Sequence, residues 1–199
     1  AKEGMIFYNA YAGAANCAPS RACLLSGLNT PRHGVYTVSP SDRGNPKTRK
    51  LIPIQNTDHL SDTIYTLPQM LKSAGYITGS FGKWHVGNDP KEQGIDVNVG
   101  GSTKGHPGKR GYFSPYKIDH ITNGPEGKYL TDRITKEAIS FVEKNRDTTF
   151  FLYLPFYTVH TPIMGKEELI EKFKNKKGSN GQNRPDYAAM VASMDENVG

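Results

Sequence analysis

The chain has 199 residues, of which 36% are hydrophobic and 22% are charged, and its formal net charge is +6. This balance is typical of a folded domain with a sizeable core and excludes a disordered chain. Lysine and arginine are spread along the sequence apart from a run at 174–177, and no RNP, zinc-finger or helix-turn-helix pattern accompanies them, so nucleic acid is not an expected partner. The longest apolar run, 150–157, is too short to cross a bilayer, and no signal-peptide segment is visible.

The first predicted elements are a strand over 5–11 and a small-residue helix from Cys17 to about Leu28. Pro19 would lie in the first helical turn, where its missing N–H group costs no hydrogen bond, so Cys17 would sit at a helix N-terminus. Six residues separate Cys17 from Cys23. On a helix this spacing puts the two thiols on different faces and beyond disulfide reach, and neither cysteine has the spacing of a zinc ligand. Cys23 is expected to be a buried apolar side chain of the helix.

The following elements alternate between helix and strand. A helix is predicted over 66–75, with Thr66 as its N-cap, and a short strand and a loop follow. Apolar residues at helical spacing predict another helix over 127–145, and the apolar run at 148–156 is typical of a strand buried on both faces. A last helix is expected over 185–198. This order predicts an α/β fold with a largely parallel central sheet flanked by helices.

The segment 88–128 is rich in Gly, Pro, Lys and Asn and is longer than an ordinary connection. It is either a binding loop, which makes it a candidate substrate-specificity region, or an irregular excursion of the chain. Tyr112, Phe113 and Tyr116 could stack on sugar rings or simply pack in the fold, and Lys109 or Arg110 could meet a sulfate group.

Polar residues with catalytic potential follow each predicted strand. Cys17 and Arg21 come after the first strand, Lys83 and His85 after the second, and His160 after the third. Each has a structural explanation when taken singly, but the carboxyl ends of parallel strands meet at one edge of a sheet, so the five should converge. A helix N-terminus, two cations and two histidines favour a tetrahedral oxyanion such as a sulfate or phosphate ester. The Gly-Lys segments do not match a P-loop.

Three stretches resemble the signatures of the type I sulfatases, which are formylglycine-dependent, arylsulfatase-like members of the alkaline phosphatase superfamily. They are CAPSRACLLSG with its downstream RHG, GYITGSFGKWHVG, and FLYLPFYTVHTP. The similarity runs across nearly the whole chain. It implies an alkaline-phosphatase-like fold, incomplete in this chain, and the activity of a sulfuric ester hydrolase.

The resemblance implies that Cys17 is converted to Cα-formylglycine by a formylglycine-generating or anaerobic sulfatase-maturating enzyme. That enzyme would read a short motif around the cysteine. The motif residues are Cys17, Pro19, Ser20 and Arg21. The hydrated aldehyde would attack sulfur, expel the alcohol, and then release sulfate, because its second hydroxyl allows the aldehyde to be restored.

The resemblance also implies roles for the other side chains of the site. Arg21 would hold the formylglycine diol, and His85 would help to eliminate sulfate. Lys83 would bind sulfate oxygens, and His160 would protonate the leaving alcohol. Asn88 and Asp89 follow the second signature closely enough to contact substrate.

A divalent cation, Ca²⁺ or Mg²⁺, would touch the formylglycine at position 17, and its remaining ligands are expected outside this chain. We therefore expect residues 1–199 to be part of an N-terminal catalytic domain that is inactive alone, with Asp195 a surface carboxylate rather than a metal ligand. The expected substrate is a sulfated saccharide. By analogy with the family, the expected location is periplasmic, lysosomal or secreted.

Three alternatives stay open at this point. One is a phosphonate monoester or phosphodiester hydrolase of the same superfamily. Another is a non-catalytic protein that binds sulfated glycans and keeps Cys17 unmodified. The third is a cysteine hydrolase that uses Cys17 with His85 or His160.

Overall fold

The computed structural model describes residues 3–38, 40–42 and 44–199 and confirms the expected α/β fold. The strands are β1 (Ile77–Phe81), β2 (Val97–Val99) and β3 (Phe150–Tyr153). The helices are α1 (Cys17–Ser26), α2 (Thr30–His33), α3 (Leu67–Ser73), α4 (Leu130–Lys144), α5 (Glu167–Lys174) and α6 (Pro185–Val198), and two short 3₁₀ helices are η1 (Pro46–Thr48) and η2 (Pro90–Gln93).

The three strands form one parallel sheet in the order β2–β1–β3, with β1 in the centre. Gly79 in β1 is level with Val97 in β2 and with Leu152 in β3. Because all three strands run in the same direction, the segments that follow them leave the sheet at one edge. This edge is where the polar residues after the strands can meet.

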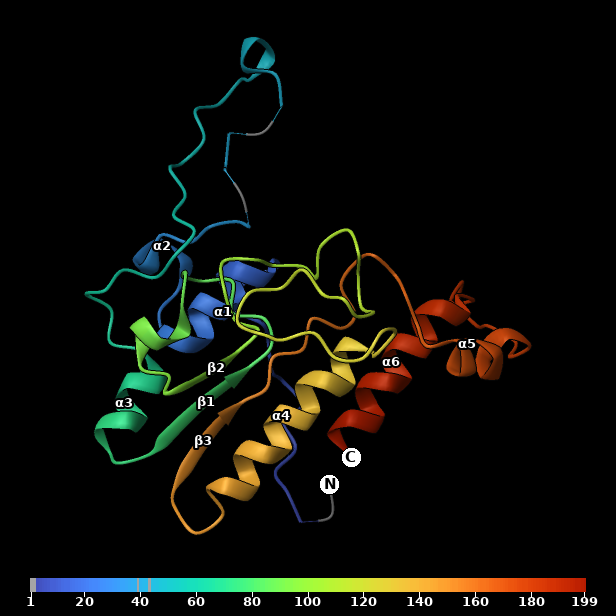
Figure 1. The fold of residues 1–199 in the computed structure, drawn as a ribbon. Helices are drawn as coiled ribbons and strands as arrows, with labels where there is room; N and C mark the ends of the chain where they lie inside the picture. The colour runs from blue at the N-terminus through green and yellow to red at the C-terminus, as the bar shows by residue number, and fades with distance from the viewer. Residues whose placement is uncertain (1–2, 39, 43) are drawn as a thin grey trace.

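Helices cover both faces of the sheet. Figure 1 shows α4 beside β3 with α6 along α4, whereas α1 and α3 lie toward the other side of the sheet. Two separate hydrophobic clusters match these layers. The cluster under α4 and α6 includes Phe81, Tyr112, Leu130, Phe141, Tyr157 and Met190. The cluster under α1 includes Ala22, Leu25, Leu60, Trp84 and Val86.

Local sequence signals explain the start of α3 and the end of β1. Thr66 and Gln69 form a reciprocal capping box at α3, which satisfies N–H groups of its first turn. Gly82, directly after β1, has φ +123°, and a Cβ atom there would collide with the carbonyl of Pro155. This close approach allows the Lys83 N–H to donate to Pro155 O at 2.7 Å, which joins the turn after β1 to the segment after β3.

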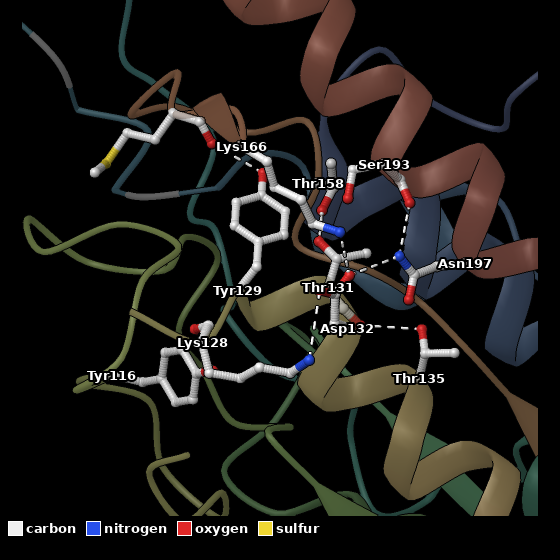
Figure 2. A network of polar contacts seen from close by, with 11 residues as sticks. Tyr116, Lys128, Tyr129, Thr131, Asp132, Thr135, Thr158, Lys166, Ser193 and Asn197 are labelled. Atoms are coloured by element: carbon white, nitrogen blue, oxygen red, sulfur yellow. Dashed lines mark hydrogen bonds and ion pairs between the residues drawn. The ribbon is translucent and has the colours of Figure 1, made fainter. Parts of the chain in front are cut away.

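A polar network centred on Asp132 joins α4 to α6 and to the start of α5 (Figure 2). Lys166 Nζ lies 2.8 Å from Asp132 Oδ1, and Asn197 Nδ2 donates to the same oxygen at 3.0 Å. Nearby, the hydroxyl groups of Thr131 and Thr158 are hydrogen-bonded at 2.5 Å. The network thus reaches from the helical layer to the segment that carries His160.

Two expectations about strands are corrected. Residues 5–11 do not form a strand, and their large apolar side chains are exposed, because no strand of the described chain pairs with them. The strand β2, within the segment 88–128, was not expected from the sequence. The predicted helices over 66–75, 127–145 and 185–198 are confirmed, and the helix that begins at Cys17 ends at Ser26 rather than near Leu28.

Candidate active site

Cys17 is the first residue of α1 and is half-buried. Asn16 precedes it as N-cap, but its side chain makes no capping hydrogen bond, so the positive end of the helix is not covered by a side-chain oxygen. The thiol faces a cavity of about 610 Å³ whose lining includes Ser20, Arg21 and Tyr153. Pro19 is buried in the first turn, as the sequence predicts. An attacking group at position 17 would therefore meet its substrate at a positive helix end.

Arg21 lies one helical turn after Cys17 and is held by groups from two other segments. Its Nη1 donates to the backbone carbonyl of Lys83 at 2.7 Å and to the Tyr153 hydroxyl at 3.2 Å. Tyr153 is the last residue of β3, and burial raises the pKa of its hydroxyl while Arg21 opposes that change. The guanidinium therefore has a fixed place between α1, the end of β1 and the end of β3.

Lys83 follows β1 and is only 3% exposed. Burial lowers the pKa of Lys83, the charge of Arg21 lowers it further, and the Cys17 side chain partly opposes both effects. Within the described residues, neither Lys83 nor Arg21 forms an ion pair with a carboxylate. Two neighbouring cations without an acidic partner favour an anion beside Cys17.

His85 is half-buried and has a positive φ of 67°, a conformation that is uncommon for a residue with a side chain. Burial lowers its pKa to about 4, and the charges of Lys83 and Arg21 act in the same direction. The ring nitrogen Nδ1 is buried and has no hydrogen-bond partner among the described residues. His85 also lines a second cavity of about 460 Å³, which lies against Ala18 of α1. At neutral pH this side chain is an uncharged imidazole that can accept a proton.

His160 is exposed in the segment after β3. Its Nδ1 donates to the carbonyl of Thr161 at 2.7 Å, which leaves Nε2 as the ring nitrogen available to a substrate. The backbone carbonyl of His160 accepts a hydrogen bond of 2.8 Å from the Tyr112 hydroxyl. Positive charge on His160 also contributes to the lowered pKa of His85, so the two histidines belong to one electrostatic environment.

Asn88 and Asp89 lie just beyond this group and differ from each other. Asn88 is exposed, whereas Asp89 caps η2 through a hydrogen bond from the Lys91 N–H at 3.0 Å and also accepts one from Asn98 at 3.1 Å. Through these contacts Asp89 stabilises the start of η2 and its link to Asn98. Its predicted contact with substrate stays a prediction, as does that of Asn88.

The aromatic residues of segment 88–128 pack in the fold. Tyr112 is fully buried and Tyr116 is 6% exposed, and both hydroxyls donate to backbone carbonyls. The prediction that Tyr112 and Tyr116 stack on a sugar ring is therefore wrong. Lys109 and Arg110 are exposed and remain accessible to a substrate.

Cys23 differs from the buried side chain expected of it. It is half-buried, lines the 610 Å³ cavity, and its sulfur lies 3.4 Å from His33 Nε2. Neither Cys17 nor Cys23 forms a disulfide bond within the described residues. Because the His33 ring accepts a hydrogen bond from the Val35 N–H at Nδ1, its Nε2–H points to the Cys23 sulfur.

No group of three or more His, Cys, Asp or Glu side chains that could hold a metal ion is found among the described residues. The charged groups around Cys17 are the cations Arg21 and Lys83, which repel a metal ion rather than ligate it. The residues present therefore do not complete a divalent-cation site. Asp195 is exposed on α6, as the sequence predicts. No helix in the part of the chain that the structure describes has the length and apolar character needed to cross a membrane.

Comparisons with known proteins point to the family that the site geometry suggests. The Sulfatase family profile matches residues 1–199. The chain is 28% identical to a sulfatase of Formosa agariphila, with 100% of this chain and 45% of that protein covered. It is also 28% identical to the N-acetylgalactosamine-6-sulfatase of Mus musculus, with 100% of this chain and 41% of that protein covered. The chain thus spans less than half the length of these relatives.

Solved structures agree with the sequence matches. The crystal structure of Ps i-CgsB matches with a TM-score of 0.71 and 27% identity, covering 95% of this chain and 44% of the other. The structure of BT4656 in complex with its substrate D-glucosamine-2-N,6-O-disulfate matches with a TM-score of 0.63 and 26% identity, covering 88% and 31%. The similarity confirms the fold of the sulfatases, which is alkaline-phosphatase-like. The chain therefore belongs to the sulfatase family.

Proposed function

We propose that the full-length protein is a sulfuric ester hydrolase that cleaves sulfate monoesters with a formylglycine derived from Cys17. The observation that carries the proposal is the pair of carboxylate-free cations, Arg21 and Lys83, fixed beside Cys17 at the start of α1. Sulfate esters are anionic, and charge grows on their oxygens in the transition state. Membership of the sulfatase family supports the same reaction.

In the proposed first step, one hydroxyl of the hydrated aldehyde loses its proton to solvent water and attacks the sulfur atom, and the bond from sulfur to the alcohol oxygen breaks. Lys83 stabilises the sulfate oxygens, and Arg21 holds the diol. His160 gives the proton of its Nε2 to the departing alcohol oxygen, because its Nδ1–H stays bonded to Thr161 O. A sulfated hemiacetal remains on the enzyme.

In the proposed second step, the other hydroxyl loses its proton, the carbon–oxygen bond to sulfate breaks, and the aldehyde forms again. His85 accepts that proton, because its lowered pKa of about 4 keeps the ring neutral at physiological pH. Water then hydrates the aldehyde and restores the diol. A cysteine thiol lacks this second hydroxyl and could not release sulfate in the same way.

The proposed cofactors follow from the family rather than from this chain's own side chains. We infer that a divalent cation, Ca²⁺ or Mg²⁺, binds next to the modified position 17 in the full-length protein. The ligands beyond position 17 would come from outside residues 1–199, since the described residues do not supply them. A maturating enzyme that recognises Cys17, Pro19, Ser20 and Arg21 would install the aldehyde.

A sulfated saccharide is the proposed substrate. One matched relative is an N-acetylgalactosamine-6-sulfatase, and matched structures contain D-glucosamine-2-N,6-O-disulfate and k-i-k-neocarrahexaose. The segment 88–128 stays the proposed specificity region, with Asn88 and Asp89 at its start and the exposed Lys109 and Arg110 further along. Such substrates suit a periplasmic, lysosomal or secreted protein.

Rates on two esters of one phenol test the proposed reaction. Full-length wild type and the C17A variant would be assayed with 4-nitrophenyl sulfate and 4-nitrophenyl phosphate. We expect wild type to prefer the sulfate ester and C17A to lose turnover by more than about 1000-fold, because the covalent route is removed. A preference for the phosphate ester would favour the phosphorus-ester alternative. Unchanged turnover in C17A would contradict a nucleophile at position 17.

A further inference from the structure

The loop after β2 reaches the same edge of the sheet as the catalytic histidines. Because β2 runs parallel to β1, the residues after Val99 leave the sheet next to those after Phe81. The His85 N–H donates to the carbonyl of Ser102 at 2.8 Å. A Cβ atom on Gly105 would collide with the His85 ring, so the backbone of the loop lies directly against that imidazole. The residue that follows Gly105 is therefore placed at the site.

That residue is His106, and its ring lies beside His160. The two ring centroids are 6.1 Å apart, with an angle of 27° between the planes. The His106 ring is also close enough to His85 to affect the pKa of that imidazole. His106 thus lies close to two histidines that the proposed reaction uses. It belongs to the candidate specificity region 88–128 but was not named as a candidate from the sequence.

Hydrogen bonds fix complementary tautomers in the two neighbouring rings. The Gly108 N–H donates to Nδ1 of His106 at 3.0 Å, so the neutral His106 ring carries its proton on Nε2. His160 uses its own Nδ1–H for Thr161 O, so its Nε2 is the nitrogen that exchanges a proton with substrate. Nε2 of His106 has no hydrogen-bond partner within the described ranges, and the side chain is exposed. A fixed donor therefore stands next to the proposed leaving-group acid.

We propose that His106 contacts the alcohol part of the substrate: its Nε2–H donates a hydrogen bond to a hydroxyl or ring oxygen of the saccharide, next to the ester that is cleaved. This role rests on the proposed function. In the proposed reaction the sulfate group binds to the buried Lys83 and Arg21, whereas the alcohol leaves next to His160, and His106 lies beside His160. A neutral N–H group suits an uncharged sugar oxygen.

Two substitutions of His106 distinguish the acceptor role of its Nδ1 from the donor role of its Nε2. H106N keeps an acceptor near Nδ1 for the Gly108 N–H but removes the donor at Nε2. H106Q places an amide N–H near the position of Nε2. H120N is the matched control, because His120 is exposed in the same segment and its φ of 57° is one that asparagine tolerates. All variants would be made in the full-length protein.

The assay compares a sulfated saccharide with 4-nitrophenyl sulfate, which has no sugar oxygen. The saccharide is whichever of N-acetylgalactosamine 6-sulfate, D-glucosamine-2-N,6-O-disulfate and neocarrahexaose wild type hydrolyses fastest. We expect H106N to lower kcat/KM on the saccharide about tenfold, mainly through KM, as the loss of one hydrogen bond predicts. On 4-nitrophenyl sulfate we expect less than about a twofold change. H106Q should recover part of the loss, and H120N should match wild type.

The outcomes distinguish this inference from the proposed function. If wild type hydrolyses neither class of ester, the proposed function fails and the role of His106 fails with it. If wild type is active but H106N retains its kcat/KM on the saccharide, or loses equally on both esters, only the role of His106 is overturned. Hydrolysis of 4-nitrophenyl sulfate without hydrolysis of any of the three saccharides also overturns it.

Discussion

Two lysines of this protein, one buried and one half-buried, have opposite surroundings. Lys83, just after β1, is 3% exposed, and the cation Arg21 is among the charged groups that lower its pKa. Lys166, just before α5, has a side chain that is 16% exposed and lies 2.8 Å from the carboxylate of Asp132. Its Nζ also lies 5.6 Å from the centre of the Tyr129 ring. Both ammonium groups are withdrawn from water, but only one has an anionic partner.

This difference separates a structural charge from one that we propose to be functional. Removing a lysine from water costs free energy unless an opposite charge or hydrogen bonds compensate for it. At Lys166 the compensation comes from Asp132 within the fold (Figure 2). At Lys83 the described residues supply no carboxylate, and the Cys17 side chain offsets the effect of burial only in part, so an anionic substrate can supply the missing negative charge. The lowered pKa of Lys83, caused first by burial, is the signature of that arrangement.

Substitution of Lys83 by methionine should have the largest effect. K83M removes a cation that stabilises the sulfate oxygens, so kcat/KM on 4-nitrophenyl sulfate should fall by about 100-fold or more in the full-length protein. The free energy of unfolding should stay the same or rise, because a buried charge without a carboxylate partner is gone. Steady-state kinetics and urea unfolding measure the two effects. A clear loss of stability with a normal kcat/KM would contradict the proposed role of Lys83 in the reaction.

The same substitution at Lys166 should do the reverse. K166M leaves the half-buried carboxylate of Asp132 without its closest cation, so the free energy of unfolding should fall by about 1–2 kcal/mol. The value of kcat/KM should remain close to that of wild type. Urea unfolding of K166M and K83M under the same conditions compares the two stabilities. A large loss of kcat/KM in K166M would show that the Asp132 network takes part in the reaction.

Removal of the Tyr112 hydroxyl tests whether this group positions His160 in the segment after β3. Y112F leaves two carbonyls, those of Tyr157 and His160, without their shared donor. We expect a stability loss of about 1 kcal/mol and a several-fold lower kcat, because His160 is no longer held in place. Y116F is the control, since the Tyr116 hydroxyl donates to Lys128 O at 2.6 Å and should cost similar stability without lowering kcat. Equal values of kcat in the two variants would contradict this positioning role.

The smallest expected effect is a dependence of stability on acid pH. Burial alone would raise the pKa of Asp132, but hydrogen bonds from Lys166 and Asn197 more than offset it and lower the pKa below its ordinary value of 3.8. This carboxylate therefore stabilises the fold above pH 3.8, and its contribution is lost as pH falls through the lowered pKa. Wild type should be more stable than D132N at pH 7, and the difference should shrink as pH falls below 3.8. Urea unfolding across this range checks it, and a constant difference would contradict the assignment.

Local signals in the sequence predicted most of the helices and two of the three strands. The capping residues of α3 and the apolar spacing of α4 are contained within each element. The strand β2 has only three residues and lies among Gly and Asn. It is defined by its pairing with β1, so no local sequence pattern predicts it. The apolar segment 5–11 shows the converse, because a strand-like pattern does not form a strand without a partner.

In the site, too, local sequence patterns do not predict features that depend on contacts between distant segments. Cys17, Arg21, Lys83, His85 and His160 were selected by their places after predicted strands and by the resemblance of three short motifs to sulfatase signatures. The structure then added the bonds that fix Arg21 and the buried state of Lys83, which depend on contacts between distant segments. His106 escaped notice because its place depends on β2 and on the approach of Gly105 to His85. Residues positioned by non-local pairing need the fold before they can be recognised.

The chemical state of position 17 in active full-length protein tests the central claim most directly. Trypsin would release Cys17 in peptide 3–21 and Cys23 in peptide 22–32, so the second thiol is an internal control. We predict that mass spectrometry finds an aldehyde that reacts with hydrazides in peptide 3–21 and an alkylatable thiol in peptide 22–32. An intact, alkylatable thiol at Cys17 in protein that turns over sulfate esters would contradict the formylglycine mechanism.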